Sequence, residues 1–117
     1  MRKRLEDILD AITELEPERS QDRESYDADK KTRVFVLHYI QIIGEAVRRI
    51  DPAWLGSHPT VPWRRIVGTR NILVHDYGGV DYAILWQILQ EDIPVLKTEI
   101  QKILAAESGS EPQQPNE

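Results

Sequence analysis

One short segment of the chain, residues 68–77, combines side chains that could act on a phosphodiester. Arg70, Asn71 and His75 flank the apolar triplet 72–74. On an ideal helix Asn71 and His75 lie four residues apart on one face, whereas Arg70 lies about 140° around the axis from His75. Because the arginine side chain is long enough to reach back around the axis, the three groups can meet at one end of a helix.

Each of these groups has a role in cleaving a phosphodiester without a metal ion. A histidine imidazole ordinarily titrates at about pH 6.5, so that of His75 can take a proton from a ribose 2′-hydroxyl or give one to the leaving oxygen. Arg70 supplies a permanent forked cation for the charge that develops on the phosphoryl oxygens, and Asn71 can orient the imidazole or bind phosphate. An arginine and a histidine at this spacing are also common as capping and surface residues. The spacing alone therefore does not establish a catalytic pair.

The distribution of charge favours a nucleic-acid contact in one region only. Fifteen basic against twenty acidic residues give a net charge of −5, which argues against a protein that coats nucleic acid non-specifically. Residues 52–75 nevertheless contain no Asp or Glu, although they include Arg64 and Arg65, and Arg48 lies just upstream. We expect a basic patch on an acidic body, and an ordinary solvated helix face would give the same pattern.

Several kinds of site are excluded or disfavoured by composition. The chain has no cysteine, which excludes disulfides, a thiolate nucleophile and a cysteine-based zinc site. His38 and His58 lack a second ligand at metal-binding spacing, so we expect no metal and no cofactor. The longest apolar runs are far too short to span a bilayer, and we expect a cytoplasmic protein with no membrane contact.

The hydrophobic periodicity predicts an all-α fold, an up-and-down bundle of four or five helices. The first expected helix covers residues 4–16 and ends at Pro17, and a polar connector leads to Asp27 as the N-cap of the next helix. Further helices are expected over residues 28–50 and over residues 62–75, with Pro62 at the first helical position. A last helical segment is expected from Asp81, as its N-cap, to about residue 105, with a kink or split at Pro94. Residues 1–106 form one domain, and residues 107–117, which lack large apolar side chains, form a disordered acidic tail.

The helix expected over residues 28–50 is apolar on two neighbouring stripes. The first stripe is Val36, Ile40, Ile43, Val47 and Ile50, and the second is Phe35, Tyr39, Ile42 and Ala46. So broad an apolar face suits a helix with more than one packing partner, either a second copy of the chain or a neighbour in its own bundle. Glu45 follows Gly44 on this helix, where we expect a buried carboxylate neutralised by Arg70.

The segment around Arg70 resembles the Arg-x4-His-x-Tyr motif of HepT-like proteins, a branch of the HEPN superfamily. Arg70, His75 and Tyr77 stand in the matching places. Other stretches resemble the same family in order, over residues 1–105. They are Lys30-Lys31-Thr32, Ile42-Ile43-Gly44-Glu45-Ala46, His58-Pro59, Pro62-Trp63, Val80-Asp81 with Trp86, and Asp92-Ile93-Pro94.

The resemblance implies a HEPN-like helical bundle that dimerises through its helices and places two motifs on either side of a shared cleft. RNA would be cut there without a metal by 2′-hydroxyl attack, with Arg70 and His75 catalytic. From the residues themselves we expect Asn71 and Glu45 to support this pair, and Arg48, Arg64 and Arg65 to bind RNA. Such proteins are usually the toxin of a toxin-antitoxin pair, and the partner is a minimal nucleotidyltransferase. That partner can adenylylate the motif tyrosine, here Tyr77, and the added bulk and negative charge would oppose RNA binding.

Two other functions are open at this point. The chain could be a non-catalytic helical dimer that binds a nucleotidyltransferase, with Arg70 and His75 structural. A DNA-binding repressor has little support beyond the arginines, because no helix-turn-helix pattern stands out and the rest of the chain is acidic. Asp76, between His75 and Tyr77, could either raise the pKa of His75 or repel RNA.

Overall fold

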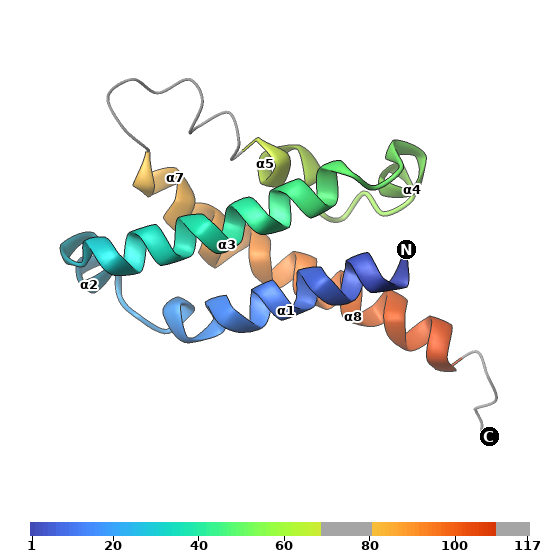
Figure 1. The fold of residues 1–117 in the computed structure, drawn as a ribbon, viewed down its shortest axis with the longest axis horizontal. Coiled ribbons are helices and arrows are strands. Elements are labelled where there is room, and N and C mark those ends of the chain that lie inside the picture. Colours follow the sequence, from blue (N-terminus) through green and yellow to red (C-terminus); the bar gives the residue numbers. More distant parts are fainter. Residues whose placement is uncertain (69–80, 110–117) are drawn as a thin grey trace.

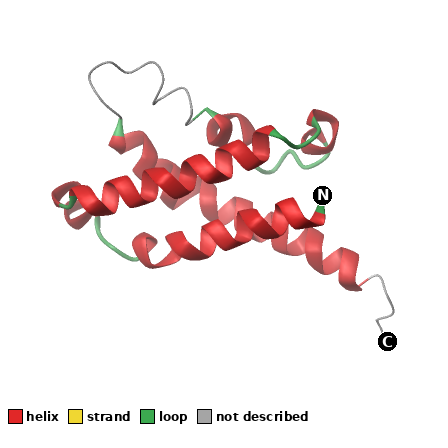
Figure 2. Ribbon diagram, in the orientation of Figure 1, coloured by secondary structure: helices red, strands yellow, loops and turns green. Residues whose placement is uncertain are grey.

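The computed structural model describes residues 1–68 and 81–109, and all regular structure within these ranges is helical (Figures 1 and 2). This confirms the all-α fold class. The elements are α1 (Arg2–Arg19), α2 (Arg23–Ala28), α3 (Lys30–Arg48), α4 (Pro52–Gly56), α5 (Trp63–Val67), α7 (Tyr82–Gln87), the π-helical turn η1 (Ile88–Asp92) and α8 (Ile93–Gly109). None of the helices in the described ranges is long and apolar enough to cross a bilayer.

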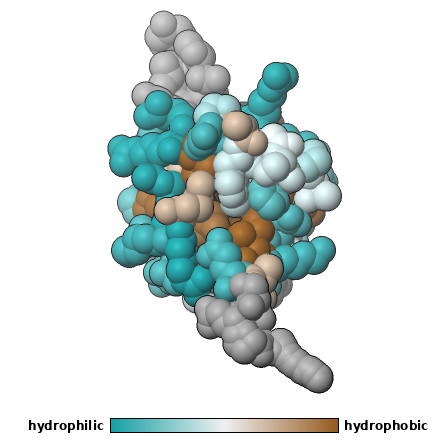
Figure 3. All heavy atoms as spheres, turned by 90° about the vertical axis from the view of Figure 1, so that its right-hand side faces the viewer, coloured by the Kyte–Doolittle hydropathy of each residue, from teal (hydrophilic) through white to brown (hydrophobic). Residues whose placement is uncertain are grey.

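The core lies where α1 packs against α3 and against α8 (Figure 1). The predicted apolar stripe of α1 and the first predicted stripe of α3 are buried in this core. Helix α8 contributes Leu96 and Ile100. The fully buried members on the first two helices are Leu5, Ile8, Ile12, Leu15, Val36, Ile40, Ile43 and Val47. Each such side chain contributes roughly 1.5–3 kcal/mol through its removal from water, so aliphatic burial dominates the stability of the fold. Hydrophilic side chains surround the apolar interior at the end of the molecule that carries α4 (Figure 3).

The second stripe of α3 is only partly covered. Phe35, Tyr39 and Ala46 are half-buried, and Ile42 is 41% exposed. The broad apolar face predicted for this helix is therefore real, but the chain's own helices cover one half of it better than the other.

Helix α1 continues past the point where the sequence predicts its end. Pro17 lies inside the helix, which runs to Arg19. The prediction that Pro17 ends the helix is wrong. The proline lacks a backbone donor and its ring crowds the carbonyl four residues earlier, but the amides of the following residues stay free to complete the last turn.

The connector after α1 contains a short helix, and α3 has a different cap from the predicted one. The Asp22 carboxylate caps α2 by accepting from the Ser25 amide at 2.7 Å, and this hydrogen bond holds the pKa of Asp22 below its ordinary value. Asp29, not Asp27, caps α3, because its carboxylate accepts from the amide of Lys31 at 3.0 Å. Asp27 instead pairs with Arg23 at 3.0 Å.

A one-turn helix, α4, occupies part of the predicted break. Asp51 caps it by accepting from the amide of Ala53 at 3.0 Å, and Pro52 occupies its first turn, where the missing donor is not needed. Helix α5 begins at Trp63. Pro62 is therefore the N-cap residue and not, as predicted, the first residue of the helix. The continuation of that helix to His75 lies outside the described residues beyond Gly68.

The disruption predicted at Pro94 takes the form of a π-helical turn. Residues 88–92 form η1, and α8 starts at Ile93, so Pro94 follows a widened turn. A proline ring clashes with the carbonyl four residues earlier in a regular α-helix, here that of Gln90, and the wider turn relieves this conflict. The Gln90 side-chain amide also donates to the backbone oxygen of Arg19 at 3.0 Å, which joins the turn to the end of α1.

Helices α7 and α8 each contact a helix near the start of the chain. Trp86 on α7 lies against buried Tyr26 with ring centroids 4.8 Å apart. The Tyr26 hydroxyl donates to the backbone oxygen of Tyr82 at 2.8 Å, and burial raises the pKa of Tyr26. The sequence predicts a disordered tail from Glu107 onward, but α8 continues to Gly109. Glu107 on this last turn pairs with Arg2 at 3.3 Å. Residues 110–117 lie outside the described ranges.

Candidate functional site

The predicted catalytic segment lies between two helices that the structure places on α3. Arg70, Asn71, His75 and Tyr77 fall within residues 69–80, outside the described ranges, and their roles stay predictions. The segment leaves from the end of α5 and returns at the start of α7, and both helices contact α3 on the same side of the molecule (Figure 1). The structure therefore shows how the two ends of the segment are held.

Asp81 fixes the return end as the sequence predicts. Its carboxylate accepts from the amides of Ala83 at 3.1 Å and Ile84 at 3.3 Å, which caps α7. Leu85 in the same helix is fully buried. The cap and the buried contact together define where the chain re-enters the bundle.

Arg65 fixes the departing end through an ion pair with the π-helical turn. Its Nε donates to Asp92 Oδ2 at 2.7 Å and its Nη2 donates to Asp92 Oδ1 at 2.9 Å, a two-point contact, and Nη2 also lies 3.2 Å from Glu91 Oε1. Asp92 is the buried member, with 6% of its side chain exposed. Burial raises the pKa of Asp92 and the hydrogen bonds from Arg65 oppose that rise, whereas the same bonds raise the pKa of Arg65.

The contacts of Arg65 differ from those expected of an RNA-binding residue. The sequence predicts an RNA contact, but the guanidinium lies against two carboxylates. Because a carboxylate removed from water needs such a partner, Arg65 serves to fix α5 on η1. The partner is 27 positions away, and no local pattern indicates it.

The other sequence-predicted site residues on the described helices are open to solvent. Arg64 is exposed on α5. Arg48 pairs with Glu45 at 3.1 Å, and their side chains are 46% and 40% exposed. The prediction of a buried Glu45 carboxylate is wrong, because the buried residue at this point of α3 is its neighbour Gly44. The predicted contact of Glu45 with Arg70 lies outside the described residues.

A second set of contacts holds residues 52–68, which we call the arm, against α8. His58 Nδ1 lies 3.2 Å from Glu99 Oε2, and Thr60 Oγ1 donates to Glu99 Oε1 at 3.3 Å. The indole Nε1 of Trp63 donates to the backbone oxygen of His58 at 2.9 Å, and the ring of Trp54 lies 4.3 Å from that of His58. Sequence reasoning missed Trp54 and Glu99, since Glu99 lies 41 positions from His58.

No metal centre is found in the described part of the chain. Its His, Asp and Glu side chains form no group of three that could hold a metal ion. Among the described residues, the His58 side chain lies near one carboxylate, that of Glu99, and against the ring of Trp54.

Comparison with known proteins places this arrangement in a family. Residues 7–103 match the family model described as ribonuclease HepT-like. The chain belongs to the ribonuclease HepT-like family. A protein of Thermococcus cleftensis named "Probable ribonuclease HepT" is 41% identical over 100 residues, which cover 85% of this chain and 91% of that protein. A protein of Methanocaldococcus jannaschii named "Putative RNase" is 40% identical over 98 residues, which cover 83% of this chain and 90% of that one. No solved structure gives a significant match.

Within this HepT-like chain, the described helices account for the framework of the site. The motif residues Arg70, His75 and Tyr77 follow directly after α5, whose end is fixed by Arg65 and by the amide of Gly68, which donates to Arg64 O at 2.8 Å. The motif side chains themselves lie outside the described residues.

Proposed function

We propose that this protein is a metal-independent endoribonuclease, the toxin of a toxin-antitoxin pair. The observation that carries the proposal is the Arg70-x4-His75-x-Tyr77 motif within a chain that matches the HepT-like ribonuclease family over residues 7–103. The relatives at about 40% identity carry ribonuclease names. The acid-free stretch 52–75 adds an electrostatic reason for RNA to approach this part of the molecule.

The proposed chemistry is attack of a ribose 2′-oxygen on the adjacent phosphorus. The bond from phosphorus to the 5′-oxygen breaks, and the products are a cyclic phosphate and a 5′-hydroxyl. His75 takes the proton from the 2′-hydroxyl or gives one to the departing oxygen, and two copies of His75 can divide these tasks. Arg70 stabilises the charge on the phosphoryl oxygens, and Asn71 and Glu45 have supporting roles.

We propose further that the protein acts as a homodimer in the cytoplasm. The support is the second stripe of α3, where Ile42 is 41% exposed and Phe35, Tyr39 and Ala46 are half-buried. An apolar face left open by the chain's own helices is typical of an interface. A second copy would also bring a second Arg70 and His75 to the substrate.

Regulation is proposed to come from a minimal nucleotidyltransferase partner. Transfer of AMP from ATP to the hydroxyl of Tyr77, with release of pyrophosphate, would place a phosphate and a nucleoside two residues from His75 in the sequence. The added negative charge repels RNA phosphate, and the added bulk competes with it for space.

The test of catalysis compares the wild type with three variants at equal expression. Relative to the wild type, His75→Ala is expected to lower RNA cleavage by roughly 10² to 10⁴-fold, and Arg70→Gln by roughly 10² to 10³-fold. Arg23→Gln is the matched control for the second change, because Arg23 lies on α2 in a surface pair with Asp27. Cleavage is expected to persist in a metal chelator. Intact RNA and equal growth on expression of the wild type and of His75→Ala would instead support the non-catalytic dimer that binds a nucleotidyltransferase.

A further inference from the structure

A groove between α4 and α5 is lined by residues up to Gly68, the last described residue before the predicted catalytic segment. It is lined by Leu55, Gly56, Trp63, Arg64, Val67 and Gly68. The walls are apolar, and Gly56 and Gly68 contribute no side chain. Gly68, at one end of the groove, stands two positions before Arg70 in the sequence.

We propose that this groove binds a nucleobase of the RNA substrate, next to the nucleotide that is cut. The proposal rests on the ribonuclease function proposed above and adds a substrate-binding site to it. A base has a flat apolar face, which suits walls formed by an indole and by aliphatic side chains. Its attached phosphate would lie within reach of the exposed guanidinium of Arg64.

Charge favours RNA over a protein partner as the occupant. No residue that lines the groove is acidic, although the whole chain contains 20 Asp and Glu residues. Within the described ranges no ion pair involves Arg64, in contrast to Arg65 on the same helix, which is held by Asp92. The absence of carboxylates makes no electrostatic difference to an uncharged aliphatic side chain of a protein partner. For an RNA phosphate it removes electrostatic repulsion from the groove.

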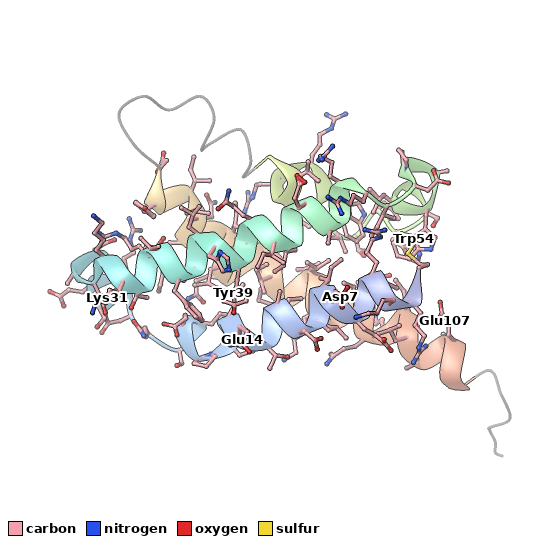
Figure 4. All side chains as sticks on the ribbon, in the orientation of Figure 1. Asp7, Glu14, Lys31, Tyr39, Trp54 and Glu107 are labelled. Carbon is pink, nitrogen blue, oxygen red and sulfur yellow. The ribbon has the colours of Figure 1, made fainter. Side chains whose placement is uncertain are left out.

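The groove is also held in shape by groups that do not face it. The Trp63 indole N–H donates to the backbone oxygen of His58, and the Trp54 and Trp63 ring centroids lie 6.3 Å apart. The position of Trp63 is therefore fixed before any ligand binds, which lowers the entropy cost of ordering the site. Trp54 marks this end of the molecule in Figure 4, and Lys31 marks the opposite end of α3.

Gly56 provides a way to fill the groove without damage to the fold. A Cβ added there meets no atom within 4 Å, and the backbone is outside the left-handed region. Gly68 offers no such opportunity, because a Cβ there would lie 3.0 Å from the backbone oxygen of Arg64. Gly56→Phe therefore tests occupancy of the groove, and Gly56→Ala shows the effect of losing the glycine itself.

The experiment measures binding of a fluorescein-labelled single-stranded oligoribonucleotide, and of an abasic oligomer of equal length, to the full chain carrying His75→Ala. Gly56→Phe is expected to weaken binding of the base-bearing oligomer roughly tenfold, well beyond the effect of Gly56→Ala, and to affect the abasic oligomer much less. Arg64→Gln is expected to weaken binding of both oligomers and to lower the slope of log affinity against log salt by about 0.7. The matched control is Arg23→Gln. Circular dichroism and the thermal midpoint of each variant confirm that it is folded.

The outcomes separate this inference from the function on which it rests. Equal binding by Gly56→Phe and Gly56→Ala, with RNA still cut by the wild type, would overturn the base site and leave the ribonuclease intact. A change in sedimentation mass with Gly56→Phe would reassign the groove to an interface between copies. A wild-type chain that neither binds nor cuts RNA would sink both proposals.

Discussion

The helices α1, α3 and α8, which we call the scaffold, and the arm, residues 52–68, are held together by different forces. The scaffold buries a continuous set of aliphatic side chains, most of them fully inaccessible. The arm buries only Val61 and Ile66, and α4 contains no buried residue. The arm relies instead on directional contacts, from His58 to Glu99 on α8 and from Arg65 to Asp92 on η1.

This difference separates stability from recognition. Burial of apolar surface is non-directional and tolerates many surface sequences, whereas a few polar pairs can be broken without loss of the core. The acidic partners lie outside the arm, Glu99 on α8 and Asp92 on η1, and the arm itself has no carboxylate side chain. The arm can therefore present cations to an anionic ligand, because the carboxylates that hold it in place belong to other elements.

The largest expected effect is on the scaffold. Ile40→Ala removes a side chain with no exposed surface from α3 and is expected to lower the free energy of unfolding by about 3 kcal/mol, as the transfer and cavity terms add. Ile84→Ala is the control, because the Ile84 side chain is 38% exposed, and its effect should be about 1 kcal/mol or less. Urea denaturation measures both. Equal effects would contradict the view that stability resides in the buried stripe.

The sequence predicts the scaffold well because helical periodicity is local. The stripe Leu5, Ile8, Ile12 and Leu15 is set by spacings of three and four residues, and all four side chains are buried. The cap at Asp81 is predicted for the same reason, since a cap depends on amides two or three positions away. Asp27 fails as the predicted cap because another aspartate, Asp29, lies directly before the helix.

The contacts of the arm could not be predicted, because their partners are distant in the sequence. Arg65 looks like any other arginine of a basic stretch until the fold brings Asp92 to it across 27 positions. Glu45 was expected to be buried because it follows a glycine, but only the tertiary packing decides that Gly44 faces inward. The predicted roles of Arg70, Asn71, His75 and Tyr77 rest on the motif and on family membership, not on described geometry.

The next largest effect is expected where arm and scaffold are joined. Arg65→Met keeps the aliphatic length of the side chain and leaves the Asp92 carboxylate, which is 6% exposed, without its main partner. The Arg65 side chain is 40% exposed, so solvent screens part of the loss, and we expect about 2 kcal/mol at pH 7. Denaturant unfolding at pH 7 and pH 5 measures the change.

The pH dependence of this loss has a definite sign. Burial already raises the pKa of Asp92, and removal of Arg65 raises it further. Above the folded-state pKa the variant carries a buried charge without a partner, and as pH falls through that pKa protonation removes the cost. The difference between variant and wild type should therefore shrink at pH 5, and Arg65→Met combined with Asp92→Asn should recover most of the loss at pH 7. A difference that is constant with pH would mean that the ion pair does not hold α5.

The smallest effect is expected for a change in the arm alone. It tests the comparison most directly, because it should open the arm locally and leave the scaffold folded. His58→Ala removes the contact with Glu99 and the ring contact with Trp54, and we expect a loss of about 1 kcal/mol. Amide hydrogen exchange should accelerate at residues 57 and 58, whose amides donate to Trp54 O and Leu55 O at 3.0 Å. The amide of buried Ile43 on α3 should exchange at the wild-type rate, because local opening of the arm leaves the core closed. Faster exchange at Ile43 as well would show that arm and scaffold unfold as one unit, and the separation of stability from recognition would fail.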